Sequence, residues 1–143
     1  MVGLGGNNGT TLTTGVFANR KHLKFATKRG DQESTYYGSF TQCATTKVGI
    51  KFENGKQVDV YKRIKDLLPM VDPNDLEISG WDISKLNLYD ATIRAKVIEP
   101  DLIRQLKDDL AKITPLPACL NPKFIASNQA DRADNVLTGS VRE

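Results

Sequence analysis

The chain has 143 residues, of which 39% are hydrophobic and 26% charged, and its formal net charge is +3. This balance excludes a disordered segment and indicates one globular domain that is long enough to bury an apolar core. The lysines and arginines are dispersed along the sequence, so the small positive excess gives no support for nucleic-acid binding.

A glycine-rich stretch, VGLGGNNGTTL, occupies positions 2–12. Glycine adopts unusual backbone torsions and lets the main chain come close to a ligand. The next residues, Thr10–Asn19, are predicted to form a helix with Leu12 and Val16 on one face. Because a helix N-terminus has unpaired N–H groups and favours negative charge, we predict a dinucleotide pyrophosphate site here. The residues predicted to hold the pyrophosphate are Gly5, Gly6, Asn7 and Asn8.

The glycine spacing differs from both standard phosphate-binding fingerprints. Gly3, Gly5 and Gly9 give G-x-G-x-x-x-G, whereas the strict dinucleotide pattern is G-x-G-x-x-G, so an ordinary glycine turn is the alternative. A P-loop is excluded because no lysine follows the last glycine. Such a loop should follow a buried strand, yet only Met1 and Val2 precede it. We therefore expect most of the first strand to be missing and the chain to start inside a larger domain.

The segment at about 24–75 is predicted to be an insertion. Tyr36–Gln42 is predicted to be a loop or edge strand, with a wall near the cofactor as the alternative. Val48–Phe52 and Gln57–Tyr61 flank an Asn-Gly pair, which predicts a β-hairpin. Arg63–Met70 is predicted to be a short helix with its leucines turned inward.

Leu76–Ile83 is predicted to be a short strand, and Asp82 lies near its end. In dinucleotide-binding folds, an acidic residue at the end of the second strand accepts hydrogen bonds from the adenosine ribose. The usual distance from the glycine loop is about 20 residues, so this assignment requires the insertion. A helix N-cap or a surface acid is the alternative for Asp82.

Two amphipathic helices are predicted next. One apolar face consists of Leu88, Ala91, Ala95 and Ile98. The second helix starts at Pro100, and its stripe consists of Leu102, Leu106, Leu110 and Ile113. Both stripes are core positions, but an incomplete sheet would leave leucines of the second stripe at risk of exposure. Lys123–Ala126 is predicted to be a short strand, and the polar run 128–135 is either a helix start or a set of cofactor contacts.

Two cysteines, Cys43 and Cys119, and one histidine, His22, limit metal chemistry. They are too few and too distant for a zinc site, so we expect no metal and two buried thiols in a reducing compartment. The sequence has neither a long apolar run nor a signal peptide. We therefore expect a cytoplasmic protein without membrane contact.

Six blocks of this sequence resemble the eukaryotic inositol-phosphate synthases, which make myo-inositol phosphate from glucose 6-phosphate. The blocks are 3–12, Tyr37–Gln42, Leu67–Val71, Ser79–Ile83, Pro115–Pro117 and Phe124–Gln129. Their shared order along nearly the whole chain is more specific than any single block. The resemblance implies an α/β fold, namely a Rossmann-like NAD-binding domain that is incomplete at both ends of this chain.

The resemblance also implies roles for individual residues. The four loop residues named above match the pyrophosphate contacts, and Asp82 matches the ribose acceptor. Gln129 and Arg132 match further NAD contacts, whereas Ala118 stands where the family often has a contact serine. The implied cofactor is NAD, the implied substrate glucose 6-phosphate, and the implied full-length assembly a homotetramer.

The implied reaction needs groups that this chain is expected to lack. NAD oxidises a sugar hydroxyl, an internal aldol step closes the ring, and the reduced cofactor then reduces the ring ketone. In the family, the lysines and acids for this chemistry come from the segment that would follow Glu143, together with the tetramer contacts. We therefore expect an NAD-binding fragment without catalytic residues. The alternative is a non-catalytic product that binds dinucleotide or only pairs with full-length subunits.

Overall fold

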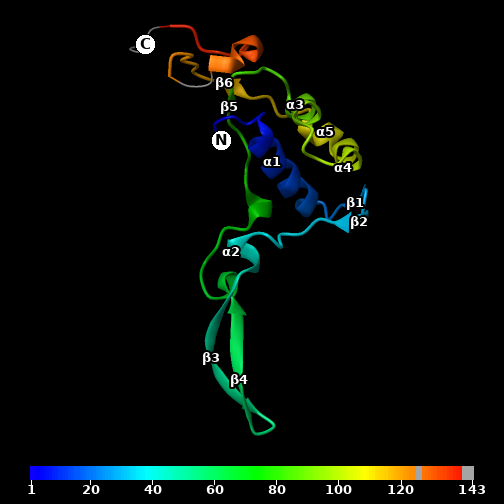
Figure 1. Ribbon diagram of the computed structural model, residues 1–143, viewed down its shortest axis with the longest axis vertical. Helices are drawn as coiled ribbons and strands as arrows, with labels where there is room; N and C mark the ends of the chain where they lie inside the picture. The colour runs from blue at the N-terminus through cyan, green and yellow to red at the C-terminus, as the bar shows by residue number, and fades with distance from the viewer. Residues whose placement is uncertain (125–126, 140–143) are drawn as a thin grey trace. The chain divides into compact units, whose positions relative to one another are not determined.

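The computed structural model describes residues 1–124 and 127–139 (Figure 1). Its contacts divide the chain into two compact units. The first unit contains Met1–Ser34 together with the chain from Glu77 onward, and the second contains Thr35–Leu76. All of the predicted cofactor contacts belong to the first unit.

Very short parallel pairings connect distant segments of the first unit. β5 (Trp81–Asp82) pairs in parallel with β6 (Leu116–Pro117). Single parallel bridges join Val2 to Trp81 and Ala118 to Val136. The unit is therefore a mixed α/β arrangement, but its described residues form no complete Rossmann sheet, because each parallel pairing is only one or two residues long.

The helix α1 (Asn7–Arg20) begins at Asn7 rather than at the predicted Thr10. Leu12 and Val16 lie four residues apart within this helix, as predicted, but Val16 is buried and Leu12 is 50% exposed. Threonines take much of the buried side of this helix, and three of them are fully buried: Thr10, Thr13 and Thr14. The hydroxyls of Thr10 and Thr13 donate to backbone carbonyls of the preceding turn, which makes their burial possible.

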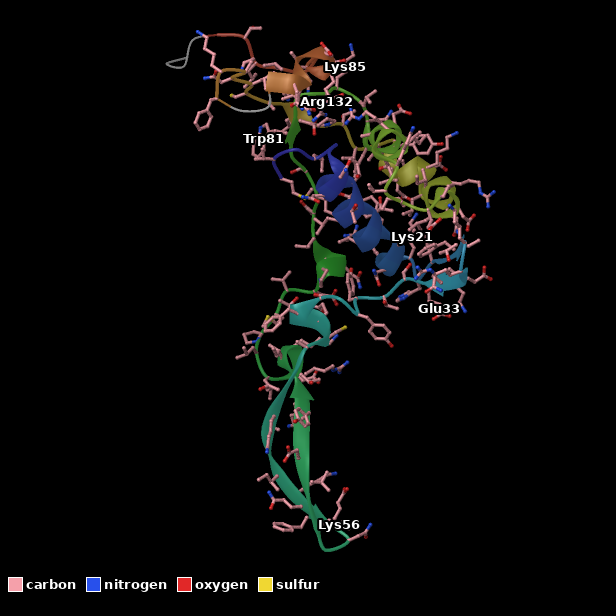
Figure 2. The ribbon with its side chains drawn as sticks, in the orientation of Figure 1. Lys21, Glu33, Lys56, Trp81, Lys85 and Arg132 are labelled. Atoms are coloured by element: carbon pink, nitrogen blue, oxygen red, sulfur yellow. The ribbon has the colours of Figure 1, made fainter. Side chains whose placement is uncertain are left out.

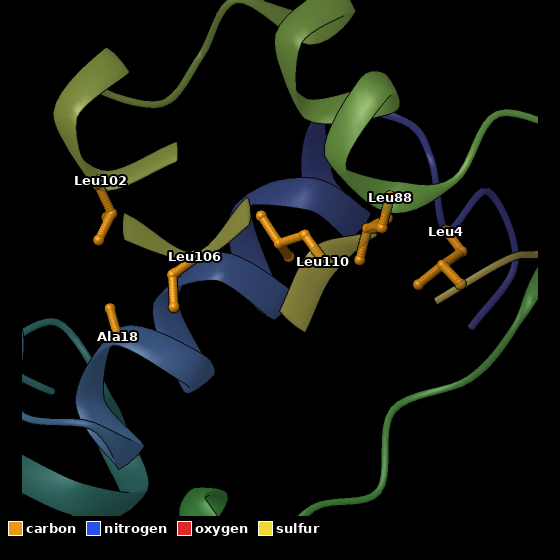
Figure 3. Close-up of a cluster of buried hydrophobic side chains, with 6 residues drawn as sticks. All are labelled: Leu4, Ala18, Leu88, Leu102, Leu106 and Leu110. Carbon is orange, nitrogen blue, oxygen red and sulfur yellow. The ribbon is translucent and has the colours of Figure 1, made fainter. Parts of the chain in front are cut away.

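The core of the first unit consists of leucines from the later helices packed on the α1 region (Figure 3). These helices are α3 (Leu88–Ala95), α4 (Pro100–Gln105) and α5 (Lys107–Leu110). The second predicted helix is interrupted at Leu106, which leaves the helical region of torsion space. The cluster consists of Leu4, Ala18, Leu88, Leu102, Leu106 and Leu110.

The expected exposure of the second stripe is wrong. Leu102 is 6% exposed, and Leu106 and Leu110 are fully buried. These side chains pack against other helices and the residue Leu4 instead of a wide sheet, so the short parallel pairings do not leave them exposed. An antiparallel pair that the sequence did not suggest, β1 (Lys24–Thr27) with β2 (Gly30–Glu33), also lies beside α4.

In the second unit, the predicted hairpin is confirmed. β3 (Thr45–Glu53) pairs antiparallel with β4 (Lys56–Arg63). Asn54 and Gly55 both have positive φ, +48° and +74°, as a two-residue hairpin turn requires. A short helix, α2 (Phe40–Cys43), replaces the predicted loop or edge strand.

The predicted helix over Arg63–Met70 is wrong. Only a 3₁₀ turn forms, over Ile64–Asp66, and Leu67 and Leu68 are 43% and 55% exposed. No apolar side chain among the described residues of the second unit is buried, so these leucines have no core to face. Without that packing, a short amphipathic segment gains too little to stay helical.

The burial predicted for both cysteines is also wrong, although both thiols are free. Cys119 is exposed, whereas its neighbour Ala118, which is bridged to Val136, is buried. Cys43 is half-buried. Part of the predicted strand Lys123–Ala126 lies outside the described residues. Within the described ranges, no helix combines the length and apolar character needed to cross a membrane.

Candidate functional site

A tight glycine turn leads directly into α1. Gly3 has φ +74°, and the N–H of Gly6 donates to the Gly3 carbonyl at 3.0 Å. Gly6 is the N-cap of the helix, and no side chain caps it. Because the first N–H groups of a helix have no acceptor within the helix, this end can receive an anion.

Glycine is required where α1 passes over the preceding loop. A Cβ atom on Gly9 would lie 2.1 Å from the Leu4 carbonyl oxygen, far inside van der Waals contact. A Cβ atom on Gly5 would lie 3.3 Å from both the Ala91 Cβ and the Asp82 Oδ2. Gly9 therefore sets the close packing of helix on loop, which is the role of the last glycine in dinucleotide fingerprints.

Asp82 is the last residue of β5, and it is only 2% exposed, so it is not a surface acid. Its Oδ2 accepts the Gly5 N–H at 2.9 Å, and its Oδ1 accepts the Ser84 N–H at 3.0 Å. Arg132 Nη1 lies 3.5 Å from the same Oδ1. The carboxylate thus ties the end of the strand to the glycine turn, and it caps no helix.

Gln129 and Arg132 come from a 3₁₀ helix, Ser127–Arg132, near the other end of the sequence. The Arg132 Nε donates to the Gln129 Oε1. Both residues face the glycine turn across a hollow of about 300 Å³. This hollow is lined by Gly5, Gly6, Asn7, Arg94, Ala95, Gln129 and Arg132.

The structure therefore brings most of the predicted cofactor residues together. Asp82 does not line the hollow itself, but it contacts two residues that do, through the Gly5 N–H and the Arg132 guanidinium. Asn8 is the exception, because its exposed side chain does not line the hollow, although it belongs to the same first turn of α1. Ala118 lies outside the hollow, bridged to Val136.

A second acid fixes the 3₁₀ segment to the turn that follows β5. Asp134 Oδ1 accepts the Lys85 N–H at 2.9 Å, and Lys85 Nζ lies 3.5 Å from the other carboxylate oxygen. Figure 2 shows Lys85 and Arg132 at the same end of the unit. The backbone hydrogen bond and the lysine charge together lower the pKa of Asp134 below its ordinary value. The carboxylate is therefore charged at neutral pH and holds the segment that carries Arg132.

Sequence reasoning missed two lining residues of the hollow, Arg94 and Ala95 of α3, of which only Arg94 has a polar side chain. Its Nη2 donates to the Gly5 carbonyl at 2.9 Å, and its Nη1 donates to Ser84 Oγ at 3.0 Å. The sequence alone held no signal for it: the spacing of three places Arg94 on the same helix face as Ala91, but only the structure shows that this face meets the glycine turn. Ala91 packs against Gly5, so Arg94 reaches the same turn.

The groups that line the hollow are of kinds that can bind an anion. They are the N–H groups at the start of α1, two arginines and two amide side chains. Over the residues that the structure describes, no three acidic, cysteine or histidine side chains gather to hold a metal ion.

Comparison with known proteins shows which family this chain belongs to. A family profile of NAD-binding regions, described as myo-inositol-1-phosphate synthase, matches residues 1–143. The chain belongs to this synthase family. The resemblance found in the six sequence blocks is confirmed.

Named synthases align with the chain at close to half identity. Inositol-3-phosphate synthase 1 of Oryza sativa subsp. japonica is 49% identical over 143 residues, which are 100% of this chain and 27% of the rice protein. The Saccharomyces cerevisiae synthase is 47% identical over 137 residues, 96% of this chain and 25% of the yeast protein. The crystal structure of the Caenorhabditis elegans synthase superposes with a TM-score of 0.88 at 48% identity, covering 96% of this chain and 27% of that one.

This synthase-family chain thus spans about a quarter of the length of the relatives it matches. The matched part is the NAD-binding region of the family. The individual NAD contacts within it stay predictions.

Proposed function

We propose that this chain is the NAD-binding part of an inositol-3-phosphate synthase whose substrate is glucose 6-phosphate. The observation that carries the proposal is the hollow at the uncapped start of α1, which is lined by residues from both ends of the sequence. The proposed NAD contacts are Gly5, Gly6, Asn7, Asn8, Asp82, Gln129 and Arg132.

The residues present fit a dinucleotide diphosphate. Gly5 and Gly6 line the hollow without side chains, and the first turn of α1 provides unpaired N–H groups and the positive end of the helix dipole. The Arg132 guanidinium adds a positive charge that can bind phosphate oxygens through paired N–H groups. About 300 Å³ matches the diphosphate and part of a nucleoside rather than a whole dinucleotide.

Asp82 is proposed to receive the adenosine ribose. Its two oxygens offer about four acceptor positions, and two of these already bind the N–H groups of Gly5 and Ser84. Because Asp82 is buried and does not line the hollow, ribose hydroxyls would reach the remaining positions only after the Arg132 guanidinium, 3.5 Å from Oδ1, moves aside. A 2′-phosphate would bring negative charge against this carboxylate, so the site favours NAD over NADP.

Within the proposed enzyme, the bound cofactor supplies a hydride acceptor and then a hydride donor for a net isomerisation. The residues described here bind and orient the cofactor through the backbone of the glycine turn and the charge of Arg132. We propose that residues of about 24–75 are an insertion in this NAD-binding domain. The sugar chemistry and the tetramer contacts are assigned to parts of the synthases that this chain does not match.

Titration calorimetry of the 143-residue chain with NAD, NADP and ADP tests the cofactor site. We expect the isolated chain to bind NAD and ADP weakly, and NADP more weakly still. Arg132→Gln should weaken ADP binding by about tenfold or more, the effect of losing a charge-assisted hydrogen bond. Arg29→Gln is the matched control, since it removes the same charge from an exposed hairpin turn. Equal ADP affinity in both variants would refute the assigned site.

A chimera tests the enzyme. Residues 1–143 would replace the matching segment of the rice synthase, and inositol phosphate formation from glucose 6-phosphate would be measured. Activity is expected in the chimera and not in the isolated chain. A chimera that folds as a stable oligomer and binds NAD but forms no product would favour a non-catalytic role.

A further inference from the structure

Gly5 is held from two sides by side chains that are far away in the sequence. Its N–H donates to Asp82 Oδ2 at 2.9 Å, across 77 positions, and its carbonyl accepts from Arg94 Nη2 at 2.9 Å, across 89 positions. Gly5 is buried and Arg94 is half-buried. A glycine has no side chain to fix its own torsions, so these two bonds decide its conformation.

The orientation of Gly5 determines where α1 begins. The Gly5 carbonyl and the Gly6 N–H belong to one planar peptide unit, so holding the carbonyl against Arg94 turns that N–H the opposite way. The Gly6 N–H then reaches the Gly3 carbonyl at 3.0 Å, and the Gly6 carbonyl receives the Thr10 N–H at 2.9 Å. The free N–H groups of the first helical turn follow directly from this arrangement.

Arg94 is itself held in place. Its second terminal nitrogen donates to Ser84 Oγ, and the buried Ser84 donates its own N–H to Asp82 Oδ1. The guanidinium therefore bridges the turn after β5 and the glycine turn through two nitrogens of one rigid planar group, a geometry that the single nitrogen of a lysine does not have. It also lines the hollow beside Arg132.

We propose that Arg94 is a positioning residue of the diphosphate site: paired with Asp82, it clamps the Gly5 peptide and so aims the start of α1 into the hollow. This inference rests on the proposed function for its ligand. The contacts that carry it are present without any ligand, so the clamp can be tested separately.

The first test measures amide hydrogen exchange in the ligand-free chain. Arg94→Met keeps the side-chain length but removes both donors, and the Gly5 N–H should exchange about tenfold faster or more. The N–H of Val16, inside α1, should change by less than about twofold, because the helix core is intact. Ser84→Ala is the matched control, since it removes only the outer partner of Arg94. Its effect on Gly5 should be smaller than that of Arg94→Met.

The second test compares ADP with adenosine in calorimetric titrations. Arg94→Met should weaken ADP by about tenfold or more, and adenosine by less than about twofold, because only the diphosphate depends on the turn. Arg94→Lys keeps the charge without the fork and should recover only part of the loss.

The outcomes separate the two proposals. Unchanged Gly5 exchange in Arg94→Met, or equal acceleration throughout α1, overturns the clamp. ADP binding that Arg94→Met leaves intact overturns the clamp's role in ligand binding while the proposed function stands. If the unaltered chain binds no ADP, the proposed function fails for this chain, and the exchange measurement alone decides whether Arg94 positions Gly5.

Discussion

Replacing Gly9 with alanine should destabilise the first unit more than any other single-methyl change in α1. The added Cβ would lie 2.1 Å from the Leu4 oxygen and 2.7 Å from the Leu4 carbonyl carbon. The helix and the loop would have to separate by about 1 Å or more to restore normal contacts. That movement would lengthen the bond from the Gly5 N–H to Asp82. Overpacking of this kind costs about 1–3 kcal/mol, partly offset by about 1 kcal/mol of better helix propensity.

The same substitution at Gly15 is the matched control, because a Cβ there meets nothing within 4 Å. Gly15→Ala should therefore stabilise the chain by about 0.5–1 kcal/mol. Urea unfolding followed by far-UV circular dichroism gives both free energies of unfolding. The two substitutions are expected to have opposite signs. If Gly9→Ala raises the stability as much as Gly15→Ala does, the close approach of helix and loop is wrong.

Three further changes test the packing and charge of the first unit. The Thr14 hydroxyl is buried and has no hydrogen-bond partner among the described residues, so Thr14→Val should raise the free energy of unfolding by about 1–3 kcal/mol. Thr13→Val should instead lower it by about 1 kcal/mol because it breaks a bond to the Gly9 carbonyl. Leu106→Ala should cost about 2–5 kcal/mol, and the half-exposed Leu68→Ala less than about 0.5 kcal/mol; equal losses in urea unfolding would contradict the assigned core. The Ala26 N–H, together with the side chains of Gln105 and Arg104, lowers the pKa of Asp101. The charged Asp101 carboxylate therefore contributes its full stabilisation above the ordinary aspartate pKa of about 3.9. This contribution is lost as the pH falls through the lower pKa of the folded state. Asp101→Asn should flatten that part of the pH–stability profile, and an unchanged profile would exclude this contribution.

Much of the candidate site could be predicted from the sequence because several of its parts depend only on residues that are adjacent in the chain. The glycine turn follows from the conformations that glycine permits, and the position of Asp82 follows from its place at a strand end. The Asn54-Gly55 hairpin is predictable for the same reason, since its turn geometry depends on two adjacent residues. Arg94 has no such local mark, because its partner carbonyl lies 89 positions away. Only the packing of Ala91 against Gly5 shows which face of α3 meets the turn.

The wrong predictions of leucine burial have a common physical cause. An apolar pattern in the sequence does not show which other part of the chain will pack against it. Leu106 and Leu68 both lie in segments predicted to be amphipathic helices, yet one is fully buried and the other is 55% exposed. Leu106 finds the helix cluster around α1, whereas the second unit has no buried apolar side chain among its described residues. Helices of this length depend on tertiary packing for most of their stability.

The sequence analysis also expected an incomplete sheet to expose leucines of the second stripe. Contacts between helices bury these leucines instead, although the parallel pairing of β5 with β6 is only two residues long. The proposed clamp does not depend on a wide sheet either, because its two hydrogen bonds to Gly5 come from one carboxylate at the end of β5 and one arginine of α3.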